Sequence, residues 1–388
     1  MNQTGTSRTK RDFLWAVLFL IVFINGFEAG GYQASLWHIG QDYDLSVTSM
    51  GLYASMELFA TMLAPLLLGR WADRSSKEKS LGILLSLQLA ASVVVFLTQS
   101  RTFFLAGVFF LGLTTSALQF IAIAALADAY PVSGKRRIGY LTSMYATGAF
   151  CSPLVVSFYL KQGLDWRTLF SLLAAGSAIA LTGLLRSGCQ PRETAPVTRS
   201  GSGQGNLLLR GVLLLCVVMC IYVGFENGFT FFVDTLFTDV LKASTGKLAL
   251  SLFWVVMIPS RVLVGHNARH AERILLFSVI AIPCLTLLLS HCADSRVVLL
   301  LCIPLGFACG AIYPSVLTML LPFAGSHTAT ATGMITTATG IGGVVFTALT
   351  GFVADRWGMS NAMTVLSLCF LLSLLSVVGV RTMNHRQE

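Results

Sequence analysis

The chain has 388 residues and a formal net charge of +9, with 55% apolar and only 11% charged residues. A soluble domain carries about a quarter charged residues, so the composition excludes an ordinary globular protein. Apolar runs of about 20 residues recur without polar–apolar alternation, which indicates membrane-spanning helices rather than a barrel. The basic residues lie in short loops between these runs, and this distribution excludes nucleic acid as a partner.

The nine cysteines lie mostly inside apolar runs, and no pair has the spacing of a zinc ribbon or of a disulfide framework. We therefore predict no metal site and no cofactor. The first apolar run starts at Phe13 and leads directly into a second span, so we do not interpret it as a cleavable signal peptide.

The apolar runs predict an all-α integral membrane protein with twelve transmembrane helices in two pseudo-symmetric six-helix bundles. A polar, Gly- and Ser-rich stretch at 187–206 predicts a linker between bundles at 1–186 and 207–388. The predicted spans are 13–36, 47–68, 80–98, 103–127, 138–160, 168–186, 208–236, 248–265, 274–291, 297–321, 328–351 and 362–380.

The basic residues are distributed unequally between the two sides of the predicted membrane. The segments on the side of the termini and of 187–206 hold 19 of the 26 Lys and Arg residues. Loops rich in Lys and Arg stay in the cytoplasm. We therefore expect a multi-pass protein of the cell inner (plasma) membrane with both termini and the linker in the cytoplasm.

The two halves share a sequence pattern. Gly-Phe-Glu-x-Gly occurs at 26–30 and again at 224–228, each time inside the first span of a half. Asp165-Trp166-Arg167 before the sixth span and Arg356-Trp357-Gly358 before the twelfth are separated by a similar offset. Such matches in order indicate a duplicated six-span unit, and a transporter built this way has its site near the midplane between the repeats.

Three acidic residues, Glu28, Glu57 and Glu226, lie well inside predicted spans. A carboxyl inside a membrane is costly and is usually functional. Burial allows such a group to hold a proton near neutral pH, so we predict proton coupling at one or more of the three, with Glu28 first. The alternative is a purely structural carboxyl that neighbouring Ser, Thr or Tyr side chains satisfy.

The stretch Gly69-Arg70-Trp71-Ala72-Asp73-Arg74, between the second and third spans, resembles the signature of the major facilitator superfamily. The signature's second half is altered here to Ser75-Ser76-Lys77-Glu78. The resemblance implies a monomeric transporter that works by alternating access. It also implies a cytoplasmic gate formed by Gly69, Asp73, Arg74 and Arg261.

Further segments resemble different branches of that family. Gly139, Gly148 and Ser152-Pro153 in the fifth span partly match the antiporter signature of drug exporters. The segments 222–226 and 310–314 resemble sugar:proton symporters instead. Trp166-Arg167-Thr168-Leu169-Phe170 resembles another family motif, which we interpret as an outer-surface anchor.

No Lys or Arg lies in the central third of any predicted span, so we expect a cationic, zwitterionic or neutral small molecule as substrate rather than an anion. Polar and aromatic residues of spans that face the cavity in this family are candidate substrate contacts. They are Tyr32, Gln33, Gln119, Tyr145, Asn227, Trp254 and Tyr313. His38 and Asp234, near the outer span ends, are interpreted as solvated rather than as an outer gate.

The expected partners are thus a small-molecule substrate, protons and the lipid bilayer. Export is slightly favoured over the alternative, proton-coupled uptake of a sugar-like solute. A non-transporting membrane sensor is the alternative from another class, and an enzyme is not expected because the histidines are scattered and the loops are short.

Overall fold

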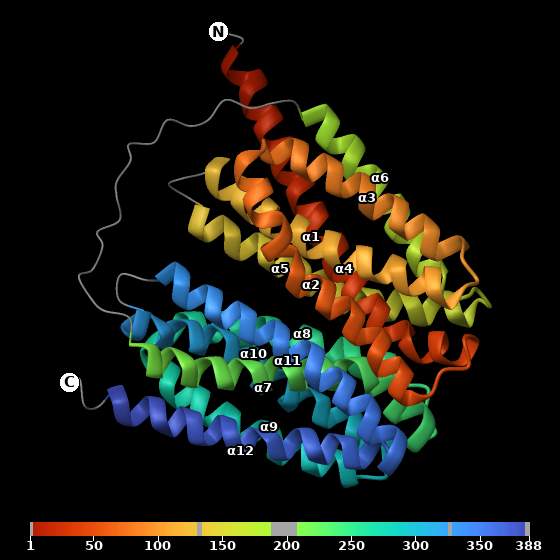
Figure 1. The fold of residues 1–388 in the computed structure, drawn as a ribbon, viewed down its shortest axis with the longest axis vertical. Coiled ribbons are helices and arrows are strands. Elements are labelled where there is room, and N and C mark those ends of the chain that lie inside the picture. Colours follow the sequence, from red (N-terminus) through yellow and green to blue (C-terminus); the bar gives the residue numbers. More distant parts are fainter. Residues whose placement is uncertain (1–2, 130–133, 188–207, 325–327, 385–388) are drawn as a thin grey trace. The chain divides into compact units, whose positions relative to one another are not determined.

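The structure is a computed structural model that describes residues 3–129, 134–187, 208–324 and 328–384. Long helices joined by short connections make up these residues (Figure 1). The helices are α1 Gln3–Asp42, α2 Val47–Arg74, α3 Lys77–Leu97, α4 Arg101–Ala129, α5 Gly134–Lys161, α6 Thr168–Ser187, α7 Leu209–Thr235, α8 Gly246–His266, α9 Ala271–His291, α10 Ser295–Ala324, α11 Thr328–Trp357 and α12 Met359–Asn384. A short π-helix, η1 (Leu236–Val240), extends α7, and a 3₁₀ turn, η2 (Ala268–His270), precedes α9.

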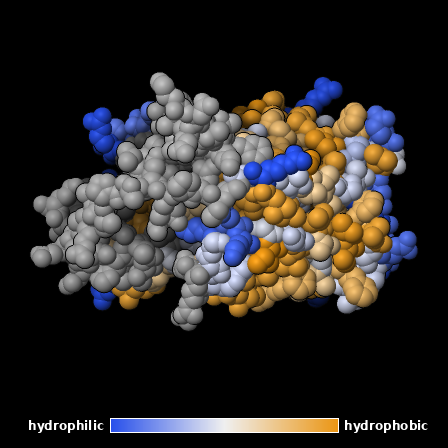
Figure 2. All heavy atoms as spheres, turned by 90° about the horizontal axis from the view of Figure 1, so that it is seen from above, coloured by the Kyte–Doolittle hydropathy of each residue, from blue (hydrophilic) through white to orange (hydrophobic). Residues whose placement is uncertain are grey.

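All twelve helices are long and apolar enough to cross a membrane, which confirms the predicted fold class and span number. Large apolar side chains such as Leu185, Phe277 and Leu375 are exposed. Figure 2 shows hydrophobic side chains over much of the visible surface of the described residues. Such a surface suits contact with lipid tails, because apolar groups need no water there.

The chain forms two compact units. The N-terminal unit comprises Met1–Ser35 and Met56–Thr198, and the C-terminal unit comprises Leu36–Ser55 and Arg199–Glu388. The boundary between Thr198 and Arg199 falls inside the predicted linker, whose residues 188–206 are outside the described part of the chain. The division into bundles at 1–186 and 207–388 stays a prediction.

Hydrogen bonds explain why Leu36–Ser55 belongs to the C-terminal unit. Trp37 Nε1 donates to Asp239 Oδ1 at 3.0 Å, and Thr48 Oγ1 donates to Asp355 Oδ2 at 2.8 Å. Gly51 also lies against the backbone of Gly351. The end of α1 and the start of α2 are thus held by η1 and α11.

The two units pair their helices in the same way. In the N-terminal unit α3 packs against α4 and α6, and in the C-terminal unit α9 packs against α10 and α12. The connection before the last helix contains a glycine with positive φ in both units, Gly163 at +79° and Gly358 at +87°. Glycine adopts this conformation without steric cost, so the duplication inferred from sequence is also visible in the internal packing.

Candidate functional site

Glu28 and Glu57 are buried carboxyl groups in the N-terminal unit. Glu28 lies on α1 with 1% of its surface exposed, and Glu57 lies on α2 with 5% exposed. Glu28 Oε2 accepts a hydrogen bond of 3.5 Å from Thr115 Oγ1 on α4. Glu57 Oε2 has no hydrogen-bond partner among the described residues. Glu57 lies against Gly112, one turn of α4 away from Thr115, so the two glutamates are close to the same part of α4.

A polar network surrounds Glu28 and joins four helices. Gln88 Nε2 on α3 donates to Asn25 Oδ1 at 3.4 Å and to Thr115 Oγ1 at 3.3 Å. Asn25 Nδ2 on α1 donates to the Thr115 carbonyl at 3.0 Å, and Ser177 Oγ on α6 donates to Gln88 Oε1 at 3.1 Å. All of these side chains are buried. Glu28 therefore lies at one end of a hydrogen-bonded chain that the surrounding protein shields from bulk solvent.

Four residues of this network were not predicted from the sequence, namely Asn25, Gln88, Thr115 and Ser177. A signal was present, because an amide inside an apolar span such as 80–98 is costly unless it is hydrogen-bonded. The partners of such an amide lie on other helices and are not visible in a single sequence.

Glycines allow α1 and α5 to approach closely. A side chain at Gly26 would meet the backbone of Tyr145, and one at Gly148 would meet the backbone of Phe23 and Phe27. Gly112 on α4 lies in the same way against the backbone of Glu57. These close approaches let the polar groups of different helices reach one another, as small residues do in other membrane helix pairs.

Glu226, in the matching position of the C-terminal unit, has different neighbours. It is buried on α7 and interacts electrostatically with Tyr222 and with Arg261 on α8. Arg261 also interacts with Tyr313 on α10. No basic residue lies in the central third of a predicted span, yet Arg261 reaches Glu226 from near the end of α8. Glu226 therefore has a basic neighbour among the described residues, which Glu28 and Glu57 do not have in the contacts described above.

In the C-terminal unit, aromatic rings surround the position that corresponds to Glu57 of the N-terminal unit. Gly306 on α10 lies against the backbone of Phe253, just as Gly112 lies against Glu57. Phe253 contacts the Phe229 ring with centroids 5.1 Å apart, and Phe225 contacts Phe370 at 5.3 Å. The place of Glu57 in one unit is thus taken by a phenylalanine in the other.

The candidate substrate contacts are distributed over both units. In the N-terminal unit Tyr32 and Gln33 are buried, and Gln119 and Tyr145 are half-buried. In the C-terminal unit Trp254 is buried beside Phe253, Asn227 is half-buried and Tyr313 is exposed. Asn227 Nδ2 donates to the carbonyl of Val223 on its own helix at 2.9 Å. Their role as substrate contacts stays a prediction.

Three of the four predicted gate residues, Gly69, Asp73 and Arg74, belong to α2, but their side chains lie outside the described part of the chain. The fourth, Arg261, is described, and its neighbours are Tyr222, Glu226 and Tyr313. Arg261 therefore has an acidic neighbour, Glu226, within the C-terminal unit. A gating role for the four residues stays a prediction.

The structure corrects the interpretation of Asp234 as a solvated residue. Asp234 is 2% exposed, and its Oδ2 accepts a hydrogen bond of 2.6 Å from Lys247 Nζ at the start of α8. His38 is half-buried and interacts electrostatically with Lys247. The sequence could not reveal this pair, because η1 and the following turn bring α7 and α8 together at that point.

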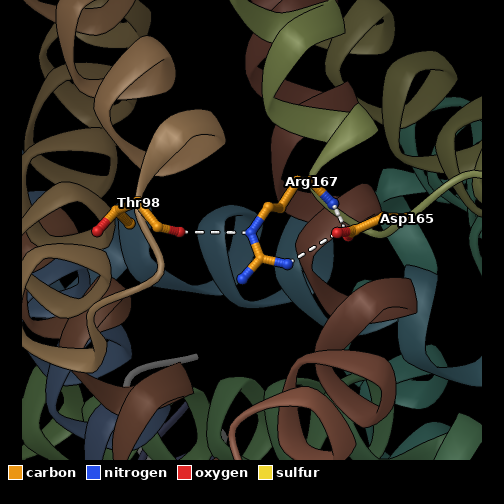
Figure 3. A network of polar contacts seen from close by, with 3 residues as sticks. All are labelled: Thr98, Asp165 and Arg167. Atoms are coloured by element: carbon orange, nitrogen blue, oxygen red, sulfur yellow. Dashed lines mark hydrogen bonds and ion pairs between the residues drawn. The ribbon is translucent and has the colours of Figure 1, made fainter.

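The Trp166-Arg167 motif anchors the start of α6 to the end of α3 (Figure 3). Arg167 Nη1 pairs with Asp165 Oδ2 at 2.7 Å, and Arg167 Nε donates to the carbonyl of Thr98 at 3.3 Å. The guanidinium also lies 4.3 Å from the centre of the Trp166 ring. The motif therefore connects the end of α3 with the segment that precedes α6. Its location at the outer surface of the membrane stays a prediction.

A family model described as Major Facilitator Superfamily matches residues 18–347, most of the chain. The chain belongs to this superfamily. One curated relative of this transporter is the glucose/mannose transporter GlcP of Bacillus subtilis (strain 168). The two are 20% identical over 345 residues, which cover 85% of this chain and 83% of the relative.

Solved structures share the fold of this transporter. A bacterial homologue of the human lysosomal transporter Spinster, in an inward-facing and unoccupied conformation, superposes with a TM-score of 0.82 at 14% identity, covering 96% of this chain and 97% of that one. A variant of the nucleoside transporter NupG superposes with a TM-score of 0.70 at 15% identity, covering 95% and 99%. At such identities the likeness concerns the fold alone.

Proposed function

We propose that this transporter moves a small molecule through the inner membrane by proton-coupled alternating access, and that Glu28 with Glu57 carries the proton. The observation that carries the proposal is that two buried glutamates of the N-terminal unit lie against the same turn of α4: Gly112 lies against Glu57, and Thr115 donates to Glu28. Two carboxyls that share a site poor in water do not both ionise readily, so the pair retains one proton. Glu226 is the weaker candidate, because Arg261 already compensates its charge.

The proposed cycle uses the proton to control access. Glu28 and Glu57 together bind a proton while water reaches them from one side, and the site closes with the pair neutral. They release the proton when water reaches them from the other side. The substrate binds in the state that takes up the proton and leaves in the state that releases it. The movement of protons down their gradient therefore drives the movement of the solute.

For the substrate we propose a neutral polar solute of the sugar type, taken up with protons. The named activity of the GlcP relative supports this class. Export of a cationic amphipathic molecule is the second candidate, supported by the partial antiporter signature and by the buried acids. The support from that signature is weaker than the sequence indicates, because close packing against α1 already accounts for Gly148.

The test is transport into proteoliposomes with an imposed pH gradient, with radiolabelled hexoses, nucleosides and a cationic dye as probes. We expect the wild-type protein to accumulate a hexose when the outside is acidic. Glu28→Gln should abolish accumulation yet retain exchange of labelled for unlabelled hexose, because the neutral amide mimics the protonated carboxyl but never releases a proton.

Glu78→Gln is the matched control, since it makes the same change in the first turn of α3, and it should accumulate hexose like the wild type. Accumulation by Glu28→Gln against a gradient would refute coupling at Glu28. Accumulation of the dye only when the inside is acidic would favour export. Saturable binding of a probe without any flux would favour the sensor.

A further inference from the structure

Gln88 is the centre of the buried polar network in the N-terminal unit. Its amide nitrogen donates to Asn25 Oδ1 and to Thr115 Oγ1, and its carbonyl oxygen accepts from Ser177 Oγ. Both amide hydrogens and the carbonyl oxygen therefore have partners, on three other helices. Gln88 is 1% exposed and does not contact Glu28 directly, so the proposed coupling site does not account for it.

The hydrogen bonds of this network have a defined direction. Because the Gln88 amide can only donate through its nitrogen, Thr115 Oγ1 accepts from Gln88. The hydroxyl hydrogen of Thr115 then points to its other neighbour, Glu28 Oε2. A donor aimed at a carboxyl group favours the ionised form, which accepts hydrogen bonds and cannot donate them.

Packing alone does not explain a glutamine at this position. A buried amide is useful to stability only when its whole network is satisfied, and apolar side chains of similar volume usually serve equally well. In the C-terminal unit the α7 glutamate has Tyr222 and Arg261 as neighbours, and no amide of the described residues takes part. Among the described residues, the amide-centred network is thus found in the unit with the carboxyl pair.

We propose that Gln88 is a positioning residue for the coupling carboxyl, and that through Thr115 it determines the pH at which Glu28 exchanges its proton. This inference rests on the proposed function, in which Glu28 with Glu57 carries the proton. The titratable groups on neighbouring helices include Glu57 on α2 and Tyr145 on α5, whose backbone lies against Gly26, two residues before Glu28. The groups from α3, α4 and α6 are Gln88, Thr115 and Ser177, which do not titrate.

The test follows proton binding directly and needs no substrate. Infrared difference spectra of the purified full-length protein in lipid are recorded over a pH series, and the carbonyl stretch of the protonated carboxyl is monitored. Glu28→Gln identifies the band, and the series is repeated in Glu57→Gln to remove the second carboxyl. We expect Gln88→Met, which keeps length and removes the amide, to move the midpoint of the Glu28 band by roughly 0.5–1 pH unit to alkaline values.

The sign follows from the direction of the hydrogen bonds. Without Gln88, the Thr115 hydroxyl is free to turn away, the ionised Glu28 loses a donor, and the proton is retained to higher pH. Thr115→Val should shift the midpoint in the same direction by at least as much. The double variant Gln88→Met/Thr115→Val should shift it no further than Thr115→Val alone, because Gln88 acts only through Thr115.

Ser92→Ala on α3 is the matched control, since Ser92 is buried about one turn from Gln88 and its hydroxyl has no hydrogen-bond partner among the described residues. It should leave the midpoint unchanged. If Gln88→Met does not fold, Ser177→Ala is the alternative variant, because it removes the hydrogen bond to Gln88 Oε1. It should move the midpoint of the Glu28 band to alkaline pH by less than Gln88→Met.

An unchanged midpoint in Gln88→Met, or additive shifts in the double variant, would overturn the role of Gln88 and leave coupling at Glu28 intact. The absence of any titrating band assigned by Glu28→Gln would overturn the proposed function itself. The two failures are thus distinguishable in one set of spectra.

Discussion

At the scale of single residues, the two units treat their buried charges differently. Glu57 has a carboxylate oxygen without a hydrogen-bond partner among the described residues, and Phe253 takes its place in the C-terminal unit. Glu226 has Arg261 nearby, and Asp234 pairs with Lys247. Among the described residues, Glu226 and Asp234 in the C-terminal unit therefore have basic neighbours, whereas Glu28 in the N-terminal unit accepts a hydrogen bond from the Thr115 hydroxyl. This difference is the physical reason for expecting proton exchange on the N-terminal side.

The Asp234–Lys247 pair permits a prediction about stability. Lys247→Met should lower the free energy of unfolding by about 3 kcal/mol, because it leaves the Asp234 carboxylate buried without its partner. Unfolding in detergent micelles, followed by thermal or denaturant titration, measures the change. The double variant Asp234→Asn/Lys247→Met should recover most of the loss.

The control for that pair is an ion pair in the same unit with greater exposure. Glu272 and Arg381 are 27% and 48% exposed, with Glu272 Oε1 and Arg381 Nε 3.0 Å apart. Glu272→Gln should change the free energy of unfolding by less than about 1 kcal/mol. Equal losses for Lys247→Met and Glu272→Gln would contradict the importance of burial.

At the scale of helices, the same crossing occurs in both units. α1 meets α5 through Gly26 and Gly148, and α7 meets α11 through Gly342, which lies against the backbone of Cys220. Lipid tails are as apolar as the helix surfaces, so moving a helix surface from lipid to another helix gives little hydrophobic gain. Close packing of the two backbones stabilises these helix pairs instead. The small residues of the Gly-Phe-Glu-x-Gly repeat thus serve the helix crossing, while its glutamate serves the polar interior.

Glycine substitutions in α11 test the crossing. Gly342→Ala should destabilise the protein by about 1–3 kcal/mol, because the new methyl group meets the backbone of α7, which cannot move without separating the helices. Gly333→Ala in the same helix is the control, since no described atom lies within 4 Å of a side chain there. Thermal unfolding in detergent measures both, and an equally small effect of the two substitutions would show that α7 and α11 tolerate a wider separation.

At the scale of the whole molecule, twelve spans and the positions of the basic residues predict the topology. With an even number of spans we expect both termini on one side, and the excess of Lys and Arg predicts that this side is the cytoplasm. The connection between α5 and α6, at Gly163, lies one span away from the predicted linker. We therefore expect the two segments on opposite sides of the membrane.

Epitope insertion tests this topology. An epitope placed in 187–206 should be labelled only after the cell membrane is permeabilised, and one placed after Gly163 should be labelled in intact spheroplasts. Hexose uptake in each insertion protein confirms that it is folded. Labelling of both epitopes from the same side would contradict the span between them, and labelling of the linker from outside would reverse the orientation.

The sequence by itself determined the fold class and the number of spans, because a membrane span is a local property of about 20 residues. The motif at 69–74 led to the family, and the three intramembrane acids were recognised because charge is costly in lipid. The helices extend past the predicted spans, as α1 does from residue 36 to Asp42, because helical hydrogen bonding continues after the apolar run ends.

Only the tertiary structure decided which neighbours the acidic residues have. The partners of Glu28, Glu226 and Asp234 come from helices up to 87 residues away along the chain. They are fixed by helix crossings at particular glycines, which no single sequence reveals. In the sequence Glu28 and Glu226 occur in the same Gly-Phe-Glu-x-Gly pattern, and Asp234 only near the end of a span. In the folded chain Glu28 has a hydroxyl neighbour, Glu226 an arginine and Asp234 a lysine, and this difference in surroundings gives each carboxyl a different chemistry.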